Sequence, residues 1–206
     1  MYQFIAFAFI IIPAVYLGRT LYKRGVKIKS IYDAFFNGLK IEFKAIRNFT
    51  LANLMDQLFH LRRILYFLTV ILASILILTG FIPVILLGKH IFGIFLLIHV
   101  LVAPFFCITT ALLILLFANQ HTFLMKDYEI SSLELYQKIS FWVFAFFSIP
   151  AILSVALSLF PIFGTDGLGN LLLLHQISVL FLTLSLILHS YFLIISITEN
   201  NTVKIL

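Results

Sequence analysis

Charged residues are scarce in this chain of 206 residues, of which 63% are hydrophobic and only 11% are charged. This composition excludes an ordinary soluble domain, and little chain remains for a separate soluble catalytic domain. The single cysteine, Cys107, excludes a disulfide within the chain, and it excludes iron–sulfur clusters and structural zinc sites, which need several ligands. The net charge of +6 does not indicate nucleic acid, because the basic residues collect beside apolar segments, as membrane topology signals do.

Five apolar segments are candidates for transmembrane helices, each of which needs about 20 residues. They are residues 1–17, 64–87, 91–118, 139–163 and 169–198. The first is marginal in length, and Arg19 would let it extend to residue 22 by reaching back to the headgroups. A cleaved signal peptide is the alternative for this segment, although no Lys or Arg precedes it. We therefore expect an all-α fold, a polytopic membrane helical bundle of about five transmembrane helices.

The segment over residues 23–59 is basic and amphipathic. Apolar residues recur in it at intervals of three and four, at Ile31, Phe35, Leu39, Phe43 and Ile46. We expect an interfacial helix with membrane lipid as its partner; a binding module for another protein is the alternative. The predicted organisation is a transmembrane helix over 1–22, this amphipathic segment over 23–59, a four-helix core over 60–198 and a tail over 199–206.

Basic residues also predict the orientation of the chain. Between Arg19 and Arg63 there are ten Lys or Arg and three acids, whereas the loop after the second span has one base and the loop after the fourth has none. Basic loops stay in the cytoplasm. The N-terminus is therefore expected outside and the C-terminus inside.

Two histidines on the fifth span are the most informative residues. His175 and His189 are fourteen residues apart on a stretch, residues 169–198, that contains no charged residue. On a helix they would face within roughly 40° of each other and lie roughly 21 Å apart along the axis. Titratable rings inside a membrane are costly and indicate a functional site. Two imidazoles on one face suit the ligation of two stacked haems; a proton or ion site is the alternative.

Each haem iron needs a second axial ligand from another helix at a similar depth. His60 lies at the cytoplasmic end of the second span, so it is the expected partner of His189 near the inner face. His99 lies about as deep in the third span as His175 does in the fifth, so these two are the expected outer pair. His90 is an alternative outer ligand, but it points away from His99 and lies at the mouth of the span.

Several polar residues stand near these ligand positions. Arg62 and Arg63 are candidate partners for haem propionates at the inner face, or cationic anchors that reach the headgroups. His121 is a candidate headgroup or propionate contact. Met55 and Met125 are alternative thioether ligands.

Small and hydroxyl residues have two interpretations each. Ser178 and Ser185 lie near the histidine stripe, where they would orient imidazoles or bond back to their own helix. Gly80, Gly88 and Gly93 would let a flat macrocycle approach closely or serve ordinary helix packing.

The stretch LHQISVLFLTLSLILHSY, residues 174–191, resembles the last ligand-bearing helix of the formate dehydrogenase gamma subunit and its di-haem cytochrome b relatives. Those relatives include the membrane subunits of nickel–iron hydrogenase and thiosulfate reductase. The family's helix carries His, thirteen residues, His, one residue and Tyr, which are matched here by His175, His189 and Tyr191. The first span and the amphipathic segment resemble those of nitrate reductase gamma-type subunits.

Two further family positions have counterparts in this chain. His60, followed later by Thr79 and Gly80, is similar to the first ligand and to the end of the span after it. His99, with Ala103 four residues on, resembles the second ligand. The resemblance implies iron ligation by His60 with His189 and by His99 with His175.

The resemblance implies an electron-transfer subunit rather than an enzyme by itself. It would hold two haem b groups in a prokaryotic cytoplasmic membrane and exchange electrons with a quinone, menaquinone or ubiquinone. The redox partner would be another subunit, an iron–sulfur protein or a multihaem cytochrome c. Asp56, His60 and Arg62 are the polar residues nearest to an inner quinone position. The alternatives are a haem-free membrane anchor and a proton or metal-ion transporter, although no acid lies inside a span.

Overall fold

The structure is a computed structural model that describes residues 2–47, 54–123, 131–160 and 162–203. Its described residues form helices and no strand. The helices are α1 (Tyr2–Lys23), α2 (Ile28–Arg47), α3 (Leu54–Leu87), α4 (Gly93–Phe117), the short 3-10 helix η1 (Ala118–His121), α5 (Ser132–Ser158) and α6 (Thr165–Val203). Met125 and the side chains of Phe43, Ile46, Met55 and Asp56 lie outside the described residues.

Five of these helices are long and apolar enough to cross a membrane. The spans are Gln3–Lys23, Phe59–Leu87, Gly93–His121, Ser132–Ser158 and Thr165–Ser196. The predicted all-α polytopic bundle is confirmed, and the chain is a multi-pass membrane protein.

Two helices begin earlier in the chain than the apolar segments that predicted them. Helix α5 begins at Ser132, ahead of the predicted residue 139, because the hydroxyl of Ser131 accepts a hydrogen bond from the Glu134 N–H at 3.3 Å. This Ser-x-x-Glu arrangement is a helix start signal that hydropathy does not detect. Helix α3 likewise begins before the predicted residue 64, so that His60 lies within the helix.

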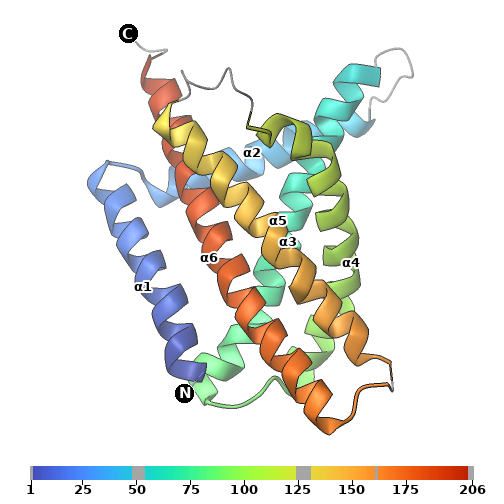
Figure 1. The fold of residues 1–206 in the computed structure, drawn as a ribbon. Coiled ribbons are helices and arrows are strands. Elements are labelled where there is room, and N and C mark those ends of the chain that lie inside the picture. The colour runs from blue at the N-terminus through green and yellow to red at the C-terminus, as the bar shows by residue number, and fades with distance from the viewer. Residues whose placement is uncertain (1, 48–53, 124–130, 161, 204–206) are drawn as a thin grey trace. The chain divides into compact units, whose positions relative to one another are not determined.

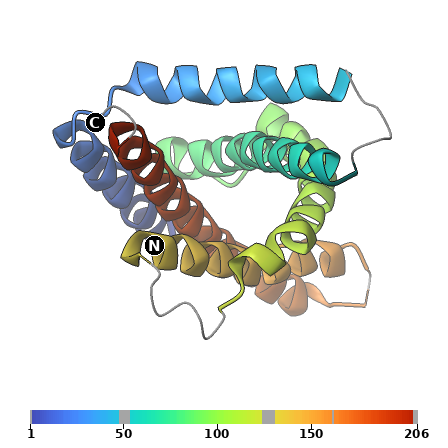
Figure 2. The same ribbon diagram turned by 90° about the horizontal axis from the view of Figure 1, so that it is seen from above.

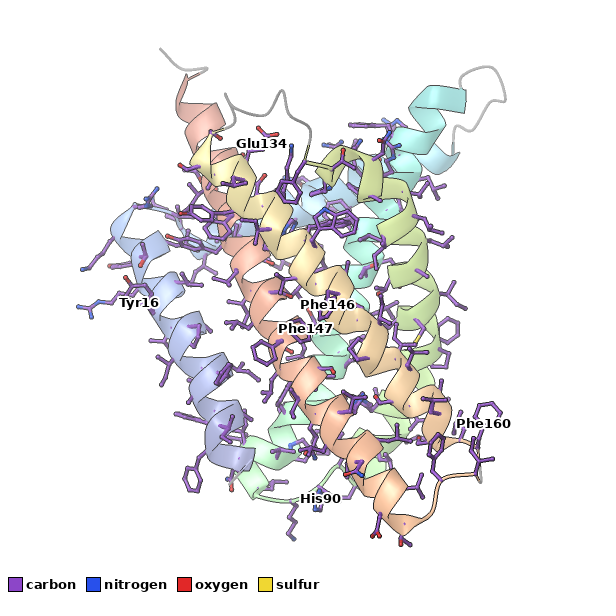
Figure 3. The ribbon with its side chains drawn as sticks, in the orientation of Figure 1. Tyr16, His90, Glu134, Phe146, Phe147 and Phe160 are labelled. Atoms are coloured by element: carbon purple, nitrogen blue, oxygen red, sulfur yellow. The ribbon has the colours of Figure 1, made fainter. Side chains whose placement is uncertain are left out.

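The chain divides into two compact units, which are described separately. The first comprises residues 1–21 and 121–206, and within it α5 and α6 run antiparallel side by side (Figure 1). The Phe147 ring, labelled in Figure 3, stacks on Phe181 with centroids 4.7 Å apart. The Phe9 ring of α1 meets Phe181 edge to face at 5.8 Å. Aromatic packing therefore joins all three long helices of this unit.

The second unit comprises residues 22–120, with α3 and α4 as an antiparallel pair. Gly88 and Gly93 flank the connection between them with φ angles of 62° and 56°, a left-handed conformation that favours glycine. Their role in the described structure is to turn the chain. Helix α2 runs across α3 and is seen lengthwise in Figure 2.

Helix α2 contacts α3 closely at Gly38. The Phe35 ring meets the Phe67 ring edge to face at 5.0 Å, and a Cβ atom at Gly38 would lie only 3.0 Å from Phe67 Cζ. Glycine therefore allows this approach, which matters because α2 also carries a side chain that reaches His60.

We predict that Gly38→Leu lowers the free energy of unfolding by about 1–3 kcal/mol, because the added side chain overlaps the Phe67 ring. Phe67→Ala should relieve part of that loss when the two changes are combined. Reversible unfolding in mixed micelles would measure a coupling of at least about 0.5 kcal/mol between the two sites. Strictly additive effects of the two substitutions would contradict this packing.

Candidate functional site

All four predicted haem ligands lie inside membrane-spanning helices and are partly buried. His60 belongs to α3, His99 to α4, and His175 and His189 to α6. Each ring directs its Nδ1 atom toward an oxygen acceptor. The acceptors differ in chemistry, and they are described below one by one.

The His175 ring is held by the backbone of α5. Its Nδ1 atom lies 3.0 Å from the Ala151 carbonyl oxygen and 3.3 Å from Ser154 Oγ. A carbonyl oxygen only accepts hydrogen bonds, so Nδ1 carries the proton in this arrangement. The Ser154 hydroxyl is itself fixed, because it donates to the same Ala151 carbonyl at 2.9 Å. The ring lone pair is therefore on Nε2.

The His189 ring is also held by α5, through a serine hydroxyl. Its Nδ1 atom lies 3.0 Å from Ser140 Oγ, which donates to the Gln137 carbonyl at 3.0 Å. Since the Ser140 proton is used, the hydroxyl oxygen accepts from Nδ1–H.

His121 lies beside His189 in the same unit. The two ring centroids are 6.4 Å apart, and the His121 ring stacks on Phe141 at 4.1 Å. The His121 carbonyl accepts a hydrogen bond from Trp142 Nε1 at 2.8 Å. His121 therefore packs against α5 near a predicted ligand, and its predicted role as a headgroup or propionate contact stays a prediction.

The His99 ring is held by α3. Its Nδ1 atom lies 3.0 Å from Thr79 Oγ1, and that hydroxyl donates to the Ile75 carbonyl at 2.8 Å. The hydroxyl therefore accepts from His99 Nδ1–H. A Cβ atom at Gly80 would lie 3.4 Å from His99 Cε1, so the glycine lets the ring lie against the α3 backbone. Thr79 and Gly80 together position this imidazole against α3.

The His60 ring has a charged acceptor. Its Nδ1 atom lies 2.5 Å from Glu42 Oε2, and the other carboxylate oxygen accepts from Arg63 Nη1 at 2.8 Å. Glu42 is 1% exposed, which is rare for a carboxylate unless it is paired. The Arg63 guanidinium also lies over the Phe59 ring, 4.9 Å from its centroid. Arg63, predicted as a propionate contact, is thus bonded to Glu42.

Other predicted residues have different surroundings. His90 is exposed in the connection between α3 and α4 (Figure 3). The buried Nε of Arg62 has no hydrogen-bond partner among the described residues. Ser178 and Ser185 donate to the carbonyls of Leu174 and Leu182 on their own helix, so the simpler of their two predicted roles is found.

Three acceptors were not identified as functional from the sequence. Ser140 and Ser154 are fourteen residues apart, the same spacing as the two histidines they contact, and this match was a usable signal. By hydropathy alone, Glu42 is one of the polar residues of its amphipathic helix. It lies three residues after Leu39, on the apolar stripe, and a carboxylate at such a position indicates a buried partner.

We predict that Ser140→Ala and Ser154→Ala each lower the free energy of unfolding by about 1 kcal/mol, because each removes an acceptor from a partly buried imidazole. Ser148→Ala is the matched control: its buried hydroxyl bonds only to the Phe144 carbonyl of its own helix among the described residues. Its cost should be less than half as large. Equal losses in all three variants, measured by unfolding in micelles, would contradict a role in holding the histidines.

The four histidines are described within their own units, His60 and His99 in one and His175 and His189 in the other. Which of them share an iron stays a prediction from their depth in the sequence. No group of three or more His, Cys, Asp or Glu that would hold a bare metal ion occurs in the described part of the chain. No protein-family model, curated protein or solved structure matches this chain.

Proposed function

We propose that this chain is a membrane di-haem cytochrome b subunit that transfers electrons between a quinone pool and a partner redox subunit. One haem b is ligated by His60 and His189, near the cytoplasmic face. The other is ligated by His99 and His175, near the outer face. The protein resides in a prokaryotic cytoplasmic membrane with its N-terminus outside and its C-terminus inside.

A shared feature of the four histidines carries the proposal. In each, an oxygen acceptor holds Nδ1–H, at Glu42, Thr79, Ala151 with Ser154, or Ser140. Histidines that ligate metals almost always donate their other ring N–H in this way, because the bond fixes the tautomer and the ring orientation. A buried imidazole needs an acceptor in any role, but here all four rings bond through the same atom, Nδ1, which leaves the lone pair of each ring on Nε2, the position for a metal.

The other residues near the ligands fit a haem. Two imidazoles satisfy one iron, so a site with three or more ligands is not required. The buried Nε of Arg62, which has no hydrogen-bond partner among the described residues, suits a propionate oxygen, and Gly80 leaves room for the His99 ring against the α3 backbone. When bound, haem supplies one-electron chemistry, whereas the chain supplies axial ligands, a low dielectric and hydrogen bonds that set the potential.

We predict that the purified protein, reduced with dithionite, gives sharp b-type absorption bands and that the pyridine assay finds about two haems per chain. Copurifying subunits identified by mass spectrometry should include a redox protein with an iron–sulfur cluster or several c-type haems. A spectrum without haem bands would overturn the proposal and leave a haem-free anchor or an ion transporter.

Single ligand variants test the assignment of each histidine. His60→Ala, His99→Ala, His175→Ala and His189→Ala should each lose one haem of the two, because one axial bond is removed. His90→Ala is the control and should keep both, because His90 is exposed in a connection. If His90→Ala loses a haem while His99→Ala keeps both, the outer ligand is misassigned.

A further inference from the structure

Among the four candidate ligands, His60 is the one whose Nδ1–H meets a carboxylate in the described part of the chain. The distance from Nδ1 to Glu42 Oε2 is 2.5 Å. The Nδ1 acceptors of His99, His175 and His189 are hydroxyl and carbonyl oxygens, which carry no net charge. The difference is chemical, because a charge-assisted hydrogen bond is shorter and roughly twice as strong as a neutral one.

The Glu42 side chain is buried, and both of its oxygens are hydrogen-bonded. The residue is 1% exposed, and each of its two oxygens receives a donor, one from His60 and one from Arg63. Burial of a carboxylate costs several kcal/mol unless donors of this kind compensate it. Glycine at position 38 lets α2 approach α3 closely enough for the contact to form.

The arrangement has a consequence for the electronic properties of the ligand. A carboxylate that draws the Nδ1 proton toward itself raises the electron density of the imidazole, so Nε2 becomes a stronger donor. A stronger axial donor stabilises ferric iron more than ferrous iron. The carboxylate would therefore lower the reduction potential of an iron ligated by His60. Arg63 offsets this effect only in part, because its side chain is 54% exposed and its charge is screened by water.

We propose that Glu42 is a positioning residue that lowers the reduction potential of one haem by polarising His60, and so makes the two haems unequal. The proposal rests on the proposed function, since it requires His60 to be an axial ligand. It concerns α2, the amphipathic helix that the sequence predicts to lie on the membrane surface. Among the described residues the Nδ1 acceptors of the other three histidines are neutral, so we expect no comparable effect at the second haem.

The test is a potentiometric titration of the haem absorption bands in the purified full chain with its copurifying subunits. Glu42→Gln keeps the size of the side chain and removes the charge. The midpoint potential of one haem should rise and that of the other should stay unchanged. Asp33→Asn is the matched control, because it removes the same charge from an exposed position on the same helix and should move neither potential.

Arg63→Gln supplies an independent measurement with the opposite sign. It retains the carboxylate and removes its counter-charge, so the same potential should fall, and Arg63→Lys should restore it. General damage to the protein would not move one potential in opposite directions in the two variants. If Glu42→Gln loses a haem, the Arg63→Gln titration decides the question.

The outcomes are distinguishable. If Glu42→Gln and Arg63→Gln both retain two haems with unchanged midpoint potentials, the proposed role of Glu42 is wrong. The di-haem proposal is not affected by that result. Wild-type protein without haem overturns the proposed function and this inference together.

Discussion

A hydrogen bond from ring Nδ1–H to an oxygen on a neighbouring helix is the interaction on which the candidate site depends. An imidazole inside a membrane span has few partners, and an unpaired ring nitrogen there is costly. The bond satisfies one nitrogen, selects the tautomer and turns the second nitrogen into an acceptor for a metal. The same bond recurs at His60, His99, His175 and His189 with different acceptors, which indicates a requirement on the ring rather than on any one partner.

The pairing of α5 with α6 explains how two of these bonds arise from one geometry. Fourteen residues correspond to about four helical turns, so residues at this spacing face the same side. Ser140 and Ser154 have this spacing on α5, and His189 and His175 have it on α6. Because the two helices run antiparallel, the register that brings Ser140 to His189 also brings Ser154 to His175. The histidine spacing that suits two haems is therefore matched by a spacing in the helix that supports it.

The sequence predicts the number of spans and the fold class, and it places the four candidate histidines within those spans, because hydropathy and helical periodicity are properties of single segments. It does not predict the ends of α5, since a cap such as Ser131 is a hydrogen bond rather than a change in hydropathy. It also does not identify the acceptors, because Glu42 and His60 lie on different helices and meet only when α2 packs on α3. The sequence leaves two roles open for Ser178 and Ser185, since helical spacing places them near the histidines without showing that they bond to their own carbonyls.

A density map of the purified complex by cryo-electron microscopy tests the central claim most directly. We expect two flat tetrapyrrole densities, each with its iron between two Nε2 atoms, one pair from His60 and His189 and the other from His99 and His175. A haem iron bonded to the Nδ1 atom of a histidine would contradict this claim. Side chains packed against every Nε2 atom, with no space for a macrocycle, would also contradict it.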